Sequence, residues 1–403
     1  MKSFRFAFFF SGIIAVLAEL SIATEKPQNI ILFIGDGMGM SHVQAASLQK
    51  ALNEKKLPIE SRLTFENFPV TGYLTTHSET NIVTDSAAAG TALACGVKAK
   101  NGMIGKSGDG KDVDSVAVLA KKRGKAVGVV TSVCLDDATP SVFYAHAGSR
   151  KETDNILEQA FVSTTYDVLM GGGVMCKGWD DEKLCKKSAE SGIFYVNSSN
   201  LKTVTPEAAA GKRVFGCFDE NNNHFLNSMD KREAGDKEPR LFEITRKALQ
   251  ILVSRSGANG FFIMVEGGAI DKYAHSNLST NVITEVLEFE KTISDTIEFL
   301  KEKSLLEQTL IVVTADHETG GLVITDKPDV TKGSTEPKKG KPVDGGTINM
   351  PEASPFNRFY VNWMVKTHTC SWVPLFATGP ESQCFAGRHD NTDVAKIIAS
   401  LLQ

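Results

Sequence analysis

The sequence predicts an α/β fold, a doubly wound sheet with helices on both faces. Five short apolar runs are typical of strands buried in a parallel sheet, at residues 29–34, 126–131, 260–265, 310–315 and 373–377. Helix-compatible segments alternate with them, at residues 41–51, 113–123, 155–161, 240–254, 281–303 and 392–402. Polar clusters follow most of the strands, at the end where ligands of such sheets bind.

The first apolar run continues into a glycine-rich turn, Gly35-Asp36-Gly37-Met38-Gly39. Its glycine spacing differs from the dinucleotide fingerprint, and a carboxylate at Asp36 would repel a pyrophosphate. We therefore expect Asp36 to present its carboxylate at the strand end, with the glycines leaving room for a large group beside it.

Metal-ligand residues recur at the other strand ends. They are Asp136, Asp137 and Thr139 after 126–131, Glu266 after 260–265, Asp316 and His317 after 310–315, and His368 shortly before 373–377. Asp271 and His275, four residues apart, share one face of a helical turn and form a common half-site for zinc, although an exposed ion pair has the same spacing. Carboxylates crowded at one edge repel each other unless cations lie between them. We infer at least two metal ions.

Ser86 lies between an acidic residue and a run of small residues. The segment from Ala87 to Ala94 has good helix formers and no proline, so Thr84, Asp85 or Ser86 is expected to cap a helix. The hydroxyl would then lie at the positive end of a helix dipole, where an anion is favoured. By itself the segment is more typical of a buried alanine-rich helix, but the ligand pattern elsewhere favours a reactive Ser86.

Six motifs together resemble those of the alkaline phosphatases, and they follow the family's order from about residue 28 to the C-terminus. They are Ile34-Gly-Asp-Gly-Met-Gly39, Thr84-Asp-Ser-Ala-Ala-Ala-Gly90, Asp137-Ala-Thr-Pro140 with Ala145-His-Ala-Gly-Ser-Arg150, Val265-Glu-Gly-Gly-Ala-Ile-Asp-Lys-Tyr-Ala-His275, Thr314-Ala-Asp-His317 and His368-Thr369. The resemblance implies a three-layer α/β/α sandwich around a mostly parallel central sheet. It further implies one domain over residues 24–403, usually assembled as a homodimer.

The resemblance also implies two zinc ions and one magnesium ion. The first zinc would be held by Asp271, His275 and His368. The second would be held by Asp36, Asp316 and His317, with Ser86 at its open position. The magnesium would share Asp36 and take Thr139 and Glu266.

Four further residues acquire roles from the same resemblance. Arg150 would bind two phosphate oxygens through its guanidinium fork. Asp137 and Lys272 match some bacterial members, where animal members carry histidines; Asp137 would hold magnesium-bound waters and pair with Lys272. Asp85 would orient Ser86 or Arg150.

The expected activity is metal-dependent hydrolysis of small phosphate monoesters through a phosphoserine on Ser86, releasing inorganic phosphate and an alcohol. A bound zinc ion lowers the pKa of a serine hydroxyl so that its oxygen can attack phosphorus. Sulfatases need a C/S-x-P-x-R context, which Ser86-Ala-Ala-Ala lacks, and phosphodiesterase relatives lack the third metal site. A non-enzymatic phosphate-binding protein would need none of these ligands.

The first 23 residues are typical of a secretory signal peptide, with a basic start, an apolar run from Phe6 to Ala18 and small residues at 21–23. We expect an exported mature chain, periplasmic or secreted, that begins near Thr24. Loss of Lys2, Arg5 and Glu19 changes the net charge from −4 to −5, so no basic excess indicates a nucleic-acid partner. No later segment is apolar enough to span a membrane.

Seven cysteines fit an oxidising compartment, and the odd number leaves at least one thiol free or paired between chains. The predicted disulfides are Cys176–Cys185, which flanks a short tryptophan-containing loop, and then Cys370–Cys384. Two polar segments, 219–239 and 326–356, are expected to be loops.

Overall fold

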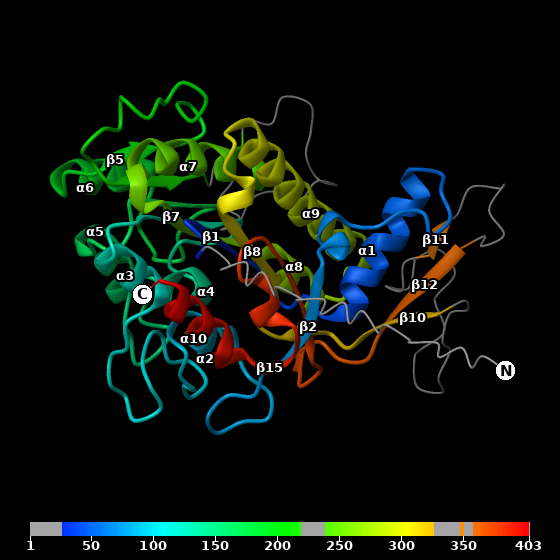
Figure 1. Cartoon of the computed structure of the whole chain (residues 1–403). Coiled ribbons are helices and arrows are strands. Elements are labelled where there is room, and N and C mark those ends of the chain that lie inside the picture. Colours follow the sequence, from blue (N-terminus) through cyan, green and yellow to red (C-terminus); the bar gives the residue numbers. More distant parts are fainter. Residues whose placement is uncertain (1–25, 219–237, 326–346, 350–357, 403) are drawn as a thin grey trace, which may run out of the picture.

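The structure is a computed structural model that describes residues 26–218, 238–325, 347–349 and 358–402 (Figure 1). The predicted signal peptide, residues 1–23, lies outside the described residues, as does most of each predicted loop. No helix within the described ranges is long and apolar enough to cross a membrane.

The main sheet has ten strands among the described residues, in the order β15-β2-β14-β8-β1-β7-β3-β4-β6-β5. Their bounds are β1 (Asn29–Gly35), β2 (Val70–Thr75), β3 (Ala126–Thr131), β4 (Val168–Gly171), β5 (Phe194–Val196), β6 (Val214–Cys217), β7 (Phe261–Gly267), β8 (Thr309–Thr314), β14 (Val373–Thr378) and β15 (Gly387–Asp390). Of these, β14 runs antiparallel to both its neighbours, β2 and β8. The other described pairs are parallel. The mostly parallel sheet is therefore confirmed.

Helices cover both faces of this sheet, which gives the predicted three-layer sandwich (Figure 1). Their bounds are α1 (Met40–Asn53), α2 (Ser86–Cys95), α3 (Val116–Lys122), α4 (Ala138–Ser141), α5 (Thr153–Val162), α6 (Asp181–Glu190), α7 (Leu241–Ser256), α8 (Ala269–Ala274), α9 (Ser279–Glu302) and α10 (Asn391–Leu401). Helices α1, α7 and α8 pack against α9, whereas α2 packs against α4 and α10. Short 3₁₀ helices occur at Thr64–Asn67, Gly257–Asn259, Leu306–Gln308 and Ser382–Phe385.

The centre of the core is β1, which lies between β7 and β8. Phe33 pairs in register with Val265 on β7 and with Val313 on β8. The side chains from Ile30 to Ile34 are fully buried, as the continuous apolar run predicts for a strand covered on both faces. This position makes the turn that follows β1 a rigid base for a site at the carboxyl edge.

Two small sheets lie outside the main one. Strand β9 (Glu318–Thr319) pairs antiparallel with β13 (His368–Thr369). Strands β10 (Leu322–Thr325), β11 (Thr347–Asn349) and β12 (Arg358–Trp363) form the other, in the order β10-β12-β11. The β9–β13 ribbon matters for function because it begins directly after His317 and contains His368.

The two predicted disulfides are wrong. Cys176 is a free thiol whose Sγ donates a hydrogen bond to Asp154 Oδ1 at 2.6 Å. Cys185 lies on α6, and it too is a free thiol, as are Cys370 and Cys384. The first bridge is predicted only because Cys176 and Cys185 flank a short loop. Closeness in sequence does not by itself bring the two side chains together.

Candidate metal centre and active site

The polar residues predicted at separate strand ends meet at one edge of the main sheet. Asp36 directly follows β1, Glu266 lies near the end of β7, and Asp316 is the second residue after β8. Because β7, β1 and β8 are adjacent parallel strands, their carboxyl ends coincide. The backbone N–H of Asp36 donates to Gly267 O at 3.3 Å, which ties the turn after β1 to the end of β7.

His317 lies at the centre of a first group of ligand atoms. Its Nε2 is 3.4 Å from Asp36 Oδ1 and 3.2 Å from Asp316 Oδ2. The Ser86 hydroxyl oxygen is also 3.2 Å from this nitrogen. The structure thus brings the predicted second-zinc residues and Ser86 together, although they come from three distant parts of the chain.

A second group comprises Asp271 in the first turn of α8, His275 at the C-cap of the same helix, and His368 on β13. Nε2 of His275 is 3.4 Å from Asp271 Oδ2, and Nε2 of His368 is 3.6 Å from Asp271 Oδ1. The two Nε2 atoms are 3.1 Å apart. All three predicted first-zinc residues therefore face one another.

Hydrogen bonds at the opposite side of each ring determine which histidine nitrogen faces the group. Nδ1 of His275 is 2.7 Å from Lys366 O, and Nδ1 of His368 is 2.9 Å from Thr84 O. A carbonyl oxygen only accepts, so each Nδ1 carries the hydrogen and each Nε2 has a lone pair. Two such lone pairs 3.1 Å apart repel unless a cation lies between them. This pattern is typical of metal-binding histidines.

Thr319, which the sequence did not identify as a site residue, fixes the ring of His317 in the same way, with the hydrogen on Nδ1. Its hydroxyl donates to Asp271 Oδ1 at 2.6 Å and lies 3.3 Å from Nδ1 of His317. The hydroxyl hydrogen is used on the carboxylate, so Nδ1 of His317 donates to the hydroxyl oxygen. The Nε2 lone pair of His317 therefore points toward Ser86, Asp36 and Asp316.

Burial makes the three strand-end carboxylates costly to ionise without a cation. Asp36, Glu266 and Asp316 are at most 3% exposed. Burial and then the neighbouring negative charges raise the pKa of Asp36 well above its usual range. Burial likewise raises the pKa of Glu266 to about 8 and that of Asp316 to about 7. Each has one buried oxygen without a hydrogen-bond partner among the described residues: Asp36 Oδ1, Glu266 Oε1 and Asp316 Oδ2. Such oxygens fit metal ions.

His317 and His368 are neutral at physiological pH, as metal ligands must be. Burial lowers the pKa of His317 and that of His368 to about 4. Burial alone would raise the pKa of Asp271, but the nearby His317, Lys272, His275 and His368 outweigh it and hold that pKa below the usual value.

Two sets of ligand atoms lie close enough to hold an ion, because all atoms within each set are within 4.8 Å of one another. One set is Asp271, His275 and His368, and the other is Asp36, Asp271 and His317. Asp271 belongs to both sets, whereas the sequence predicts it as a ligand of the first zinc only.

Two further contacts concern the residues predicted to hold magnesium. Thr139 Oγ1 lies 3.5 Å from Asp36 Oδ2, and Glu266 accepts a hydrogen bond from Thr131. Thr131 was not foreseen either.

Ser86 is the first residue of α2, and Asp85 is its N-cap. Asp85 Oδ1 accepts from Ala88 N at 3.0 Å, which resolves the three capping alternatives. The other Asp85 oxygen accepts from Gly102 N at 3.0 Å. The small-residue face of α2 packs on α4, where a Cβ added to Gly90 would lie 3.3 Å from Val142. This packing buries Ser86 to 2% exposure.

A chain of alternating charges borders the serine. Asp137 Oδ1 accepts from Arg150 at 2.8 Å, and Asp137 Oδ2 lies 2.8 Å from Lys272 Nζ. The second Arg150 nitrogen is 3.5 Å from Asp85 Oδ2. Burial alone would raise the pKa of Asp137, but Lys272 and Arg150 outweigh it and hold that pKa well below the usual range. The predicted pairing of Asp137 with Lys272 is therefore present.

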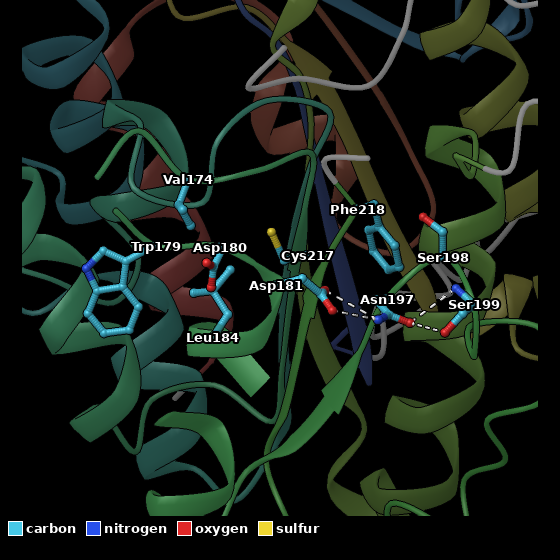
Figure 2. Close-up of a pocket in the computed structure, with 10 residues that line it drawn as sticks. All are labelled: Val174, Trp179, Asp180, Asp181, Leu184, Asn197, Ser198, Ser199, Cys217 and Phe218. Carbon is cyan, nitrogen blue, oxygen red and sulfur yellow. Dashed lines mark hydrogen bonds between the residues drawn. The ribbon is translucent and has the colours of Figure 1, made fainter. Parts of the chain in front are cut away.

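A separate pocket of about 460 Å³ lies near the ends of β4 and β6 and beside α6 (Figure 2). Its lining includes Asp181, Asn197 and Ser199. These polar groups bond to one another, since Asn197 donates to Asp181 and accepts from Ser199 at 2.6 Å. None of the residues predicted for the site lines this pocket.

The fold and the clustered ligands define a metal-dependent hydrolase with an α/β/α sandwich. The chain belongs to the alkaline phosphatase family, since the family model described as alkaline phosphatase matches residues 27–403. Alkaline phosphatase 4 of Bacillus subtilis is 32% identical over 444 residues, covering 96% of this chain and 93% of the relative. The Escherichia coli alkaline phosphatase is 28% identical, covering 93% and 86%.

A solved structure is also similar over nearly the whole chain. The alkaline phosphatase from the Antarctic bacterium TAB5 superimposes with a TM-score of 0.73 at 27% identity, covering 94% of this chain and 98% of that one. The predicted fold is therefore confirmed. As a member of this metal-dependent family, the chain is a phosphate monoester hydrolase, and a phosphoserine intermediate is general in the family.

Proposed function

We propose that Ser86 is the nucleophile of this phosphate monoester hydrolase, and that two zinc ions and one magnesium ion serve it. The observation that carries the proposal is the position of the Ser86 hydroxyl, 3.2 Å from Nε2 of His317 and buried beside Asp36 and Asp316. A serine placed among metal-ligand atoms is activated by the metal rather than by a neighbouring base.

The proposed ligand sets follow the resemblance. Asp271, His275 and His368 hold the first zinc, while Asp36, Asp316, His317 and Ser86 hold the second. Asp36, Thr139 and Glu266 hold the magnesium. The unpartnered oxygens of Asp36, Glu266 and Asp316 support these sets. When bound, the ions lower the pKa of the serine hydroxyl and neutralise charge on the transferred phosphate.

The chain's own residues hold the reactants. The Ser86 oxygen attacks phosphorus, the ester P–O bond breaks, and the alcohol leaves; water then releases phosphate from Ser86. The Arg150 fork binds two non-bridging phosphate oxygens. Asp85 and Asp137 orient this fork, since its two terminal nitrogens lie 3.5 and 2.8 Å from their carboxylates. Lys272, paired with Asp137, adds positive charge beside the phosphate.

The wider proposal covers the whole chain. Residues 24–403 form one domain that assembles as a homodimer, in keeping with the family resemblance. Residues 1–23 direct export, to the periplasm or to the medium, in keeping with their basic start and apolar run. Small phosphate monoesters are the substrates.

One assay series tests the proposal. An aryl phosphate monoester, a phosphate diester and an aryl sulfate are offered to the enzyme before and after chelation, with zinc and magnesium then added back. We expect the monoester to be hydrolysed preferentially, with activity lost on chelation and restored by the two ions. Monoester hydrolysis that survives complete metal removal would contradict the metal assignment, and preferential diester or sulfate hydrolysis would contradict the substrate class.

A further inference from the structure

Glu318 is a buried carboxylate that lies between two residues of the metal centre but does not belong to either ligand set. It follows His317, precedes Thr319 and is 4% exposed. The Thr369 hydroxyl donates to its Oε2, as does Gly321 N at 3.2 Å, and Leu322 N donates to its Oε1 at 3.2 Å. Both carboxylate oxygens are therefore occupied by hydrogen bonds within the protein.

The bond from Thr369 joins the two strands of the β9–β13 ribbon, which begins directly after His317 and contains His368. In the β9–β13 ribbon, Thr369 pairs with Glu318 and His368 pairs with Thr319. The two-residue strands have few backbone bonds to hold them in register. The side-chain bond from Thr369 to Glu318 adds a contact directly beside His368, and charge-assisted bonds of this kind are stronger than neutral ones.

Glu318 also contacts the turn that carries Asp36. A Cβ added to Gly39 would lie 2.2 Å from Glu318 Cγ, so no larger residue fits there. Gly39 has φ −73°, so the requirement is for space and not for an unusual backbone. Gly39 is the N-cap of α1, which has no acidic residue in its own first turn. The Glu318 carboxylate supplies negative charge near this end of the helix, which stabilises it.

His42 closes the other side of the carboxylate. Its Nδ1 is 3.9 Å from Glu318 Oε1, its ring is fully buried, and Trp363 packs edge-on at 5.7 Å between ring centroids. Neither ring nitrogen has a hydrogen-bond partner among the described residues. The Glu318 side chain thus lies against α1 as well as within the ribbon, and Trp363 of β12 packs against His42.

We infer that Glu318 is a positioning residue for the metal centre, which holds His317, His368 and Asp36 at fixed separations by joining the segments that carry them. This inference rests on the proposed function, because it requires those residues to bind metal. The simpler reading is a buried carboxylate that stabilises the Gly320–Gly321 turn and the fold in general. The two readings differ in whether loss of the carboxylate weakens metal binding specifically.

The test compares zinc affinity and stability in the full-length chain. Zinc affinity is measured by competition with a chromophoric chelator, and stability is measured by thermal unfolding of the metal-free form. Glu318→Ala is expected to weaken zinc binding about 10- to 100-fold, as is typical when a residue that orients ligands is lost. Glu318→Gln, which keeps an acceptor for Thr369, is expected to lose less.

A matched control is Glu290→Ala on α9. Glu290 is also buried and accepts hydrogen bonds from Thr64 N and Oγ1 and from Lys50 Nζ, but it contacts none of the ligand-bearing segments in these bonds. The Glu290→Ala variant should be less stable than the wild type, with unchanged zinc affinity. If Glu318→Ala fails to fold, Thr369→Val is used instead, because it removes one hydrogen-bond donor to the Glu318 carboxylate. Thr369→Ser keeps a hydroxyl donor and should therefore retain zinc affinity.

The outcomes separate this inference from the proposed function. Wild-type zinc affinity in Glu318→Ala or, if that variant fails to fold, in Thr369→Val would overturn the positioning role. An equal zinc loss in Glu290→Ala would also overturn it, because it would show a general effect of destabilisation. A wild-type chain that binds no zinc would overturn the metal assignment itself, and the positioning role with it.

Discussion

The Ser86 hydroxyl oxygen lies 3.2 Å from Nε2 of His317, although the two residues are 231 positions apart in the chain. Ser86 begins α2, and His317 follows β8 near the centre of the sheet. A serine in the first turn of an alanine-rich helix is ordinary by itself. A buried serine at this position within contact distance of a metal-ligand nitrogen is not, and the proposed chemistry depends on this relationship.

Arg150→Ala is expected to weaken phosphate binding without loss of metal. A hydrogen bond to a charged group contributes about 1.5–3 kcal/mol, so inhibition by inorganic phosphate should weaken by at least about 10- to 100-fold, the loss that one such bond would cause. The zinc content, measured by elemental analysis, should stay at the wild-type value, because the ion pairs of Arg150 are with Asp137 and Asp85, which are not proposed zinc ligands. Arg150→Lys should recover little, because lysine cannot form the fork. Equal loss of zinc and of phosphate affinity would contradict the role.

Asp271→Ala is expected to impair both zinc sites, whereas His275→Ala impairs one. The reason is that Asp271 belongs to both sets of close ligand atoms and His275 to only one. Zinc content per chain after extensive dialysis is the measurement. Identical stoichiometry in the two variants would mean that Asp271 does not connect the sites.

Asp137→Ala should destabilise the metal-free protein by about 2 kcal/mol. Removal of one partner from a buried charge cluster costs about 3–5 kcal/mol. The value here should be smaller, because the Arg150 and Lys272 side chains keep 27% and 31% exposure and can be rehydrated. Asp112→Ala, which removes an exposed pair with Lys106, serves as the control and should cost less than about 1 kcal/mol. Chemical denaturation measures both, and equal losses would contradict the buried network.

The metal-free protein should lose stability as the pH rises from about 6.5 to about 8.5. The pKa of Glu266 is raised to about 8 and that of Asp316 to about 7, so the folded state favours their protonated forms. Their contribution is fully present below about pH 4, the usual pKa of a carboxyl group, and is lost as the pH passes through the raised values. The lowered pKa values of His317 and His368 act below about pH 6.5, outside this window.

The loss should be on the order of 1 kcal/mol and is measured by thermal unfolding in chelator at the two pH values. Asp316→Asn should reduce the slope, because it removes one of the titrating groups. A metal-free protein that becomes more stable over this range would show that the buried carboxylates are not protonated in the folded state.

Long apolar runs and strand-end residues could be predicted from sequence. Asn29–Gly35 and Thr309–Thr314 are buried on both faces, so their patterns are continuous and unambiguous. Strands β4, β6 and β5, which lie together at one side of the sheet, are only three or four residues long and were missed, as were β2 and β15. Such short segments have too few residues for a periodic pattern.

The residues that orient the ligands could not be predicted. Thr319 and Glu318 act through side-chain bonds to Asp271 and Thr369, and these partners are far from them in sequence. No spacing rule points to such pairs, because they depend on how the ribbon folds back onto α8 and α1. Likewise, the shared position of Asp271 between two ligand sets requires three-dimensional distances.

Trapping the phosphorylated enzyme tests the role of Ser86 most directly. The metal-loaded chain is mixed with an aryl phosphate monoester, quenched in acid during turnover, digested and analysed by mass spectrometry, with Ser86→Ala treated in parallel. We expect phosphate on the peptide that contains Ser86, and no phosphate on that peptide in the variant or in chelated enzyme. Phosphate on another residue, or full turnover by Ser86→Ala, would contradict this role.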